Sequence, residues 1–196
     1  MDLTPLGQIV RLQIQLDTPI SGAKPNRAYD PKTLMTAETM TLTPHGALVH
    51  APDGQAIMDI HHAHHPQTRN DEDTNALSVN FTAHYDAMRA EFGEHLWNGC
   101  AGENILVEVV TQIELGRLAR GLAIQPQSGG ALVRLKKVLV AHPCRPFSGY
   151  VMKGTEASVK EALQFLDDGM RGFYCALDGD GPAVVAVGDM VLLPHA

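Results

Sequence analysis

Hydrophobic and polar residues alternate with a period of two near the start of the chain. Over residues 7–16, the apolar Val10, Leu12, Ile14 and Leu16 occupy every second position. Side chains at alternate positions of a strand share one face, so the pattern predicts a strand over residues 7–16. Turn-forming residues bound further strand-like segments, which are predicted over residues 34–43, 47–50, 104–115, 132–141, 172–177 and 183–193.

Helical periodicity is strong in two places only. Over residues 82–93, Tyr85, Met88 and Phe92 follow a helical spacing, and Thr82 is the expected N-cap. A second helix is predicted over residues 155–169, beginning near Thr155, with its apolar stripe on Val159, Ala162, Leu163 and Leu166. Many short strands with two helices favour a mainly β fold, a closed β-barrel with a few peripheral α-helices.

The length and composition favour one soluble domain over residues 1–196. No apolar run reaches the roughly 20 residues that a membrane helix needs, and the acidic, interrupted start is unlike a signal peptide, so we expect a cytoplasmic protein. A net charge of -7 argues against nucleic-acid binding. Three scattered cysteines do not form a disulfide framework or a C-x-x-C zinc motif.

The sequence lacks several motifs of common enzyme classes. It contains no G-x-S-x-G, no P-loop, no H-E-x-x-H and no G-x-G-x-x-G. No nicotinamide or flavin cofactor is therefore indicated.

One segment differs from the acidic average. Between Glu114 and Glu156 the chain has no acidic residue and seven basic ones, Arg117, Arg120, Arg134, Lys136, Lys137, Arg145 and Lys153. Such a segment either holds a small anionic ligand or exposes its charges to solvent. The sequence leaves both interpretations open.

Cys144 lies in this basic segment, at the end of an apolar run. His142 and Arg145 flank it and could favour the thiolate, which is the reactive form of cysteine. Pro143 and Pro146 cannot donate ladder hydrogen bonds, so they are expected to end the strand and stiffen a loop that presents the sulfur. The pattern predicts a reactive cysteine, with a small apolar filler as the alternative. Of the other cysteines, Cys175 is expected in the core, and Cys100 beside a turn is undecided.

Two turns and a histidine cluster are further candidates for the site. Glu103 and Asn104 follow Gly102 in a tight turn, which would direct Glu103 as an acid or base and Asn104 as a hydrogen-bonding group. Arg171 joins a predicted helix to a strand and is a candidate anion contact.

The histidine cluster comprises His61, His62, His64 and His65. His61 and His65 would share a helix face, and imidazole is a common ligand of zinc, copper and nickel. The alternatives are a hydrogen-bonding or proton-transfer role for one histidine, and simple surface exposure.

In order along the chain, GENI (102–105), HPC (142–144), GMRGFY (169–174) and VGDMV (187–191) resemble the motifs of the MOSC domain, the C-terminal module of molybdenum cofactor sulfurases. The resemblance extends over residues 43–193. It implies a β-barrel that binds the molybdenum cofactor, in a family also associated with molybdenum ion and pyridoxal phosphate binding. It further implies a stand-alone member, because the sulfurases carry a desulfurase domain and the reductases an additional β domain.

The resemblance implies that Cys144 carries sulfane sulfur as a persulfide or ligates molybdenum. Glu103 and His142 would then assist catalysis, and Gly102, Asn104, Arg145, Arg171 and Tyr174 would contact the ligand. A cysteine desulfurase would be the sulfur donor. The alternatives are a molybdenum-cofactor-dependent reductase of N-hydroxylated compounds and a divalent-metal-binding module.

Overall fold

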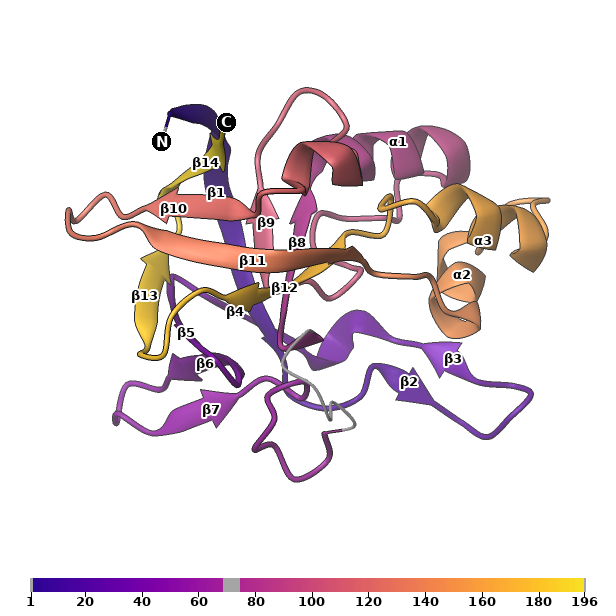
Figure 1. Cartoon of the computed structure of the whole chain (residues 1–196). Helices are drawn as coiled ribbons and strands as arrows, with labels where there is room; N and C mark the ends of the chain where they lie inside the picture. The colour runs from indigo at the N-terminus through magenta and orange to yellow at the C-terminus, as the bar shows by residue number, and fades with distance from the viewer. Residues whose placement is uncertain (1, 69–74, 196) are drawn as a thin grey trace.

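The chain folds around a closed, seven-stranded β-barrel (Figure 1). The computed structural model describes residues 2–68 and 75–195. Strand order around the barrel is β1 (Leu3–Gln15), β14 (Met190–Pro194), β10 (Leu122–Gln125), β11 (Val133–Val140), β12 (Phe173–Leu177), β8 (Leu77–Phe81) and β9 (Ile105–Val107), which pairs with β1 again. Among the pairings of these seven described strands, β8–β9 is parallel and the others are antiparallel. The predicted mainly β barrel is confirmed.

A bulge changes which face of β1 is buried. The pairing of β1 with β9 shifts register between Ile9 and Arg11. Before the bulge Ile9 is buried, and after it Leu12 and Ile14 are buried, whereas Val10 is 38% exposed. An extra residue in one strand reverses the facing of the side chains beyond it. Of the four apolar positions expected on one face, Leu12 and Ile14 are therefore buried in the core, whereas Val10 and Leu16 are exposed.

Short strands extend the barrel on one side. β4 (Leu34–Ala37) pairs with β1, and β5 (Thr39–Thr43) begins a separate sheet with order β13 (Ala183–Ala186), β5, β6 (Gly46–His50) and β7 (Ala56–Met58). The single strand predicted over residues 34–43 is therefore two strands in different sheets. A hairpin of β2 (Ile20–Ser21) and β3 (Ala28–Tyr29) projects on the other side (Figure 1).

The described residues form three α-helices outside the barrel, α1 (Thr82–Phe92), α2 (Arg145–Val151) and α3 (Val159–Leu166), and α2 packs against β3 of this hairpin (Figure 1). β9 separates two cores, since Ile105 and Val107 face the barrel interior and Leu106 faces the helices. The helix side buries the predicted residues Tyr85, Met88 and Phe92. Helix α2 was not predicted, although a proline in its first turn is a recognised helix-start signal.

Several predicted boundaries are wrong. The strand expected over residues 104–115 is only Ile105–Val107, and β8 and β10 were missed. Thr82 is the first residue of α1 rather than its N-cap, and its hydroxyl bonds the backbone of Val109 instead. Helix α3 begins after Ser158, which forms a capping box with Glu161. Among the described residues, no helix is both long and apolar enough to cross a bilayer.

At Gly172 the backbone passes close to the backbone of β8. The φ of Gly172 is 112°, a conformation that favours glycine, and a Cβ there would lie 2.9 Å from the carbonyl oxygen of Val79. We predict that Gly172→Ala lowers the free energy of unfolding by about 1–3 kcal/mol, measured by urea denaturation. Gly179→Ala is the control, because nothing lies within 4 Å of its Cβ position. Equal stability of the two variants would contradict this account.

Candidate active site

The site is a cavity of about 540 Å³ between the barrel, the β2–β3 hairpin and the start of α2. Chemically capable residues reach it from segments far apart in the sequence. These include His61, Glu103, His142, Cys144, Arg171 and Tyr174. Five of the six were predicted as catalytic or ligand-binding residues, and His61 was predicted as a candidate metal ligand.

Cys144 is the cysteine that reaches the cavity. It is partly exposed and lies immediately before α2, where its carbonyl accepts hydrogen bonds from the backbone N–H (2.9 Å) and the hydroxyl (3.1 Å) of Ser148. Pro146 lies within the first turn of α2, so a helix start and not an extended loop holds the sulfur.

The other two cysteines are buried. Burial raises the pKa of Cys100, and it raises the pKa of Cys175 to about 12, so both are held as thiols at neutral pH. The predicted core position of Cys175 is confirmed.

Arg171 supplies the positive charge of the cavity. Burial lowers the pKa of its guanidinium, but the nearby Tyr174, Cys144 and Tyr29 raise it, and the net shift is upward. The guanidinium lies over the ring of Phe147 at 5.6 Å, and its Nε atom is buried without a hydrogen-bond partner in the described structure. A buried donor without a partner is rare in proteins, and an anionic ligand would satisfy it.

Glu103 is a buried carboxyl group at the cavity wall, 4% exposed. The hydroxyl of Tyr85 lies 2.9 Å and 2.8 Å from its two oxygens and accepts a hydrogen bond from the backbone N–H of Ala101. Burial raises the pKa of Glu103 to about 7, against smaller lowering effects of its own backbone, Tyr85, Arg171 and Arg11. The carboxyl group can therefore hold or release a proton near neutral pH.

The turn that precedes Glu103 requires glycine at position 102, because Gln15 packs against it. A Cβ on Gly102 would lie 2.8 Å from Nε2 of Gln15, whose amide donates to the Gly102 carbonyl at 2.8 Å.

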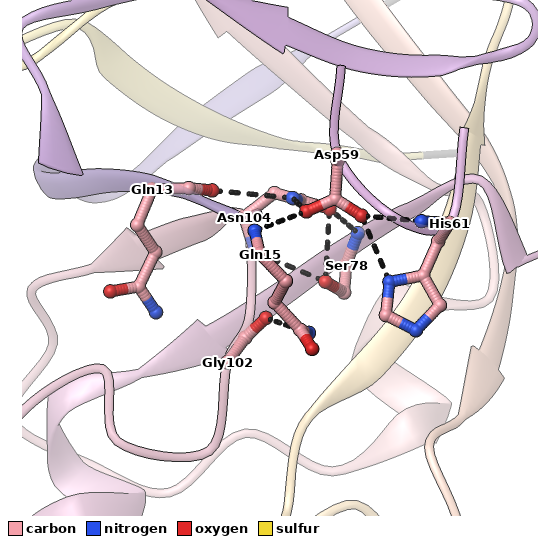
Figure 2. A network of polar contacts seen from close by, with 7 residues as sticks. All are labelled: Gln13, Gln15, Asp59, His61, Ser78, Gly102 and Asn104. Carbon is pink, nitrogen blue, oxygen red and sulfur yellow. Dashed lines mark hydrogen bonds and ion pairs between the residues drawn. The ribbon is translucent and has the colours of Figure 1, made fainter. Parts of the chain in front are cut away.

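Asn104 faces the opposite way from Glu103. Its side chain bonds Ser78, Gln13 and Asp59 within the protein, and it is not among the residues that line the cavity (Figure 2). The structure thus gives Asn104 a positioning contact in place of the ligand contact expected for it.

The histidine cluster divides into different environments. His61 lines the cavity, and its Nδ1 lies 2.9 Å from the buried carboxylate of Asp59 (Figure 2). His62 is buried and meets His64 edge to face, with ring centroids 5.4 Å apart, while His65 lies in a bend and is partly buried. Residues 2–68 and 75–195 contain no group of three or more His, Cys, Asp or Glu that could hold a metal ion. The structure does not pair His61 and His65 as metal ligands.

The basic side chains of the segment between Glu114 and Glu156 do not line the cavity, although Cys144 of the same segment does. Of its seven basic residues, none is among the described residues that line it. Arg145 is exposed on α2, and Lys136 pairs with Asp178 at 2.7 Å. His142, two residues before Cys144, does line the cavity. Its side chain is 80% exposed and pairs with Asp167 at 3.0 Å. Arg171, from outside the segment, is the cation of the site.

Sequence reasoning missed Asp59, Tyr85 as a polar partner, and Tyr29. Tyr29 lines the cavity and donates a hydrogen bond to the carbonyl of Cys100 at 2.8 Å. A signal for Asp59 did exist, because an acid two residues before a histidine can accept hydrogen bonds from the turn that carries it. Tyr85 was assigned to an apolar stripe, and the stripe does not show where its hydroxyl points.

Glu103 yields a pH-dependent prediction. Its folded pKa of about 7 lies above its ordinary value, so the folded state binds more protons and stability falls as pH rises from about 4.5 to 7. We predict that the stability of Glu103→Gln relative to the unsubstituted protein improves by up to about 3 kcal/mol across this range, measured by urea denaturation at each pH. Glu91→Gln, exposed on α1, is the control. Parallel pH profiles for the Glu103 variant and the unsubstituted protein would refute the assignment.

The comparisons with known proteins agree with this architecture. The YuaD protein from Bacillus subtilis superposes with a TM-score of 0.57 at 14% identity, over 100% of this chain and 98% of YuaD. A hypothetical protein of known structure gives 0.57 at 15% identity, over 98% and 70% of the chains. YiiM from Geobacillus stearothermophilus gives 0.51 at 12% identity, over 99% and 76%. Identities this low show the fold alone.

The sequence itself identifies the family. No curated protein matches it. The family model of the MOSC domain, however, matches residues 60–192, which is more than half of the chain and includes the GEN turn, Cys144 and Arg171. The chain belongs to the MOSC domain family.

Proposed function

We propose that this protein is a sulfur carrier in which Cys144 accepts sulfane sulfur as a persulfide, for delivery to the molybdenum cofactor or to a metal–sulfur centre. The observation that carries the proposal is the placement of the cysteines. Cys144 is partly exposed at a cavity that also holds Arg171, whereas Cys100 and Cys175 are buried. We expect this chemistry in the cytoplasm, where thiols stay reduced.

The transfer step is thiol–disulfide exchange with a desulfurase persulfide. The Cys144 thiolate attacks the terminal sulfur of the donor's Cys–S–SH group, a new S–S bond forms, and the donor's S–S bond breaks. The donor leaves as a thiolate, so no external oxidant or reductant is needed. Because only the thiolate attacks, the reaction requires a group that takes the proton of the Cys144 thiol.

The cavity is larger than a sulfur atom requires, which supports a role for a bound acceptor. A volume of about 540 Å³ lies within the range of small-molecule sites. The unpartnered Nε of Arg171 fits an anionic group such as a phosphate, and the Cys144 sulfur fits a soft metal such as molybdenum. When bound, the molybdenum cofactor would supply the metal that accepts sulfur. No lysine is among the described residues that line the cavity, and we do not propose pyridoxal phosphate chemistry.

We predict that incubation with a cysteine desulfurase and free cysteine adds one sulfur atom to the peptide containing Cys144, measured by intact mass and peptide mapping under non-reducing conditions. Cys144→Ser should abolish the added mass. Cys100→Ala, which removes a buried thiol, should retain it. An added sulfur in Cys144→Ser, or none in the unsubstituted protein, would overturn the carrier function.

A second candidate is a molybdenum-cofactor-dependent reductase of N-hydroxylated compounds. The buried Glu103 favours it, because a carboxyl group with a pKa of about 7 can donate a proton to a substrate as it is reduced. In both candidates, Arg171 would hold the anionic part of the ligand.

The two arginines near Cys144 allow a test of cofactor binding. We predict that protein purified from a host that makes the molybdenum cofactor contains molybdenum by elemental analysis. Arg171→Gln should lower the molybdenum content at least about tenfold, since it removes the buried charged donor. Arg145→Gln should not change it, because Arg145 is exposed on α2. Equal losses in the two variants would contradict the assignment of the anion contact to Arg171.

A further inference from the structure

Hydrogen bonds hold the main chain of Arg171, the cation of the cavity, on both sides. Its backbone N–H donates to the carbonyl of Leu166, the last residue of α3, at 3.1 Å. Its carbonyl accepts from Nδ2 of Asn80 at 3.2 Å. The main chain from which the guanidinium extends is therefore held by one helix carbonyl and one side-chain amide.

Asn80 lies on β8 and is completely buried, and its amide has one possible orientation. Oδ1 lies 2.9 Å from the backbone N–H of Phe81, which can only donate, and Nδ2 faces the carbonyl of Arg171, which can only accept. A further contact of 2.9 Å joins Oδ1 to Nδ1 of His84 on α1. The amide thus connects a barrel strand, an outer helix and Arg171.

The second contact of His84 fixes which ring nitrogen carries the hydrogen. Nε2 accepts from the backbone N–H of Ile113 at 3.0 Å. Burial lowers the pKa of His84 to about 4, so the ring is neutral at pH 7. The backbones of Ile113, Gly169 and Met170 act on this pKa in the opposite direction. A neutral ring with an accepting Nε2 carries its hydrogen on Nδ1 and donates it to Asn80.

Asn80 and His84 also pack against the residues that follow Arg171. A Cβ on Gly172 would lie 3.1 Å from both Cβ and Cγ of Asn80, so glycine at this position lets the amide come close to the chain. The rings of His84 and Phe173 have their centroids 6.2 Å apart. The two buried polar residues therefore lie directly behind the segment that carries the cavity cation.

We infer that Asn80 and His84 are positioning residues for Arg171. Asn80 holds the Arg171 carbonyl, His84 holds the Asn80 amide, and together they keep the guanidinium at the cavity that contains Cys144. Neither Asn80 nor His84 is among the described residues that line the cavity, so they act through Arg171 and not on a ligand. The inference rests on the proposed role of Arg171 as the anion contact of the site.

The first test compares the alkylation of Cys144 by iodoacetate, which is an anion, with its alkylation by neutral iodoacetamide at pH 7.5, without any desulfurase. The ratio of the two rates reports positive charge near the sulfur, because a change in the amount of thiolate affects both reagents alike. Cys144 is one of the groups that act on the charge of Arg171. Arg171→Gln should therefore lower the ratio at least about threefold, and Asn80→Ala at least about twofold.

Two variants of His84 separate its contacts. The amide nitrogen of asparagine can replace Nδ1, whereas the amide oxygen of glutamine can replace Nε2. His84→Asn keeps a donor toward Asn80 and should leave the ratio unchanged. His84→Gln keeps only the acceptor toward Ile113 and should lower the ratio about twofold, since the Asn80 amide loses a partner.

Gln13→Ala is the matched control for Asn80→Ala. It also removes a buried amide that donates to a main-chain carbonyl, that of Gly99 at 2.7 Å, and Gln13 does not line the cavity. The ratio should be that of the unsubstituted protein. An unchanged ratio in Asn80→Ala, or equal losses in the two His84 variants, would overturn the inference.

Two NMR measurements read the arrangement directly. The buried Nε–H of Arg171, identified by its loss in Arg171→Gln, should exchange with solvent more slowly than that of the exposed Arg145. Asn80→Ala should speed this exchange at least about tenfold, and Gln13→Ala should not. If Asn80→Ala does not fold, long-range ¹H–¹⁵N spectra of the unsubstituted protein at pH 7 still decide. They should show His84 protonated at Nδ1 alone, and a protonated Nε2 would refute the chain of bonds.

The positioning role and the carrier function fail separately. If Cys144 forms no persulfide but Asn80→Ala lowers the alkylation ratio, the carrier function is wrong and the positioning role stands. If the persulfide forms and Asn80→Ala changes neither the ratio nor the exchange of the Arg171 Nε–H, the carrier function stands and the positioning role is wrong.

Discussion

The hydrogen bond between Asn104 and Asp59 is the contact on which the site depends. Asn104 also bonds Gln13 on β1 and Ser78 on β8, so one amide ties two barrel strands to the loop that carries His61 (Figure 2). All of these groups are buried or partly buried, where an unsatisfied polar atom costs about 1–3 kcal/mol. The network therefore favours one arrangement of three segments over any alternative.

The Gly-Glu-Asn turn gives three consecutive residues three different tasks. Gly102 allows the backbone to approach Gln15, Glu103 faces the cavity, and Asn104 faces the polar network behind it. Because Glu103 and Asn104 point in different directions, one short turn connects the polar network around Asp59 to the cavity. The three residues of this motif are therefore needed together, one for its backbone and two for their side chains.

The charges of the cavity follow from what surrounds it. The helix side excludes water from Tyr85 and Phe147, and this burial raises the pKa of Glu103 to about 7 while the guanidinium of Arg171 stays charged above Phe147. A proton-exchanging carboxyl, a fixed cation and a thiol thus line one cavity. This combination suits a ligand that has an anionic group for Arg171 and a soft metal or sulfur atom for Cys144. Residues from both the barrel and the outer helices are needed to form it.

The sequence by itself determined the barrel class, the motif order of the family, the buried stripe of α1, and Cys144, Glu103 and Arg171 as residues of interest. Local periodicity and short motifs carry this information because they depend on neighbouring residues only. The tertiary structure decided that Arg171, and not the basic segment, is the cavity cation, that Asn104 faces the protein, and that Asp59 orients His61. The first two outcomes depend on contacts between residues tens of positions apart, which the closure of the barrel sets and no local pattern records. The contact of Asp59 with His61 is local, but only the fold places this pair at the cavity.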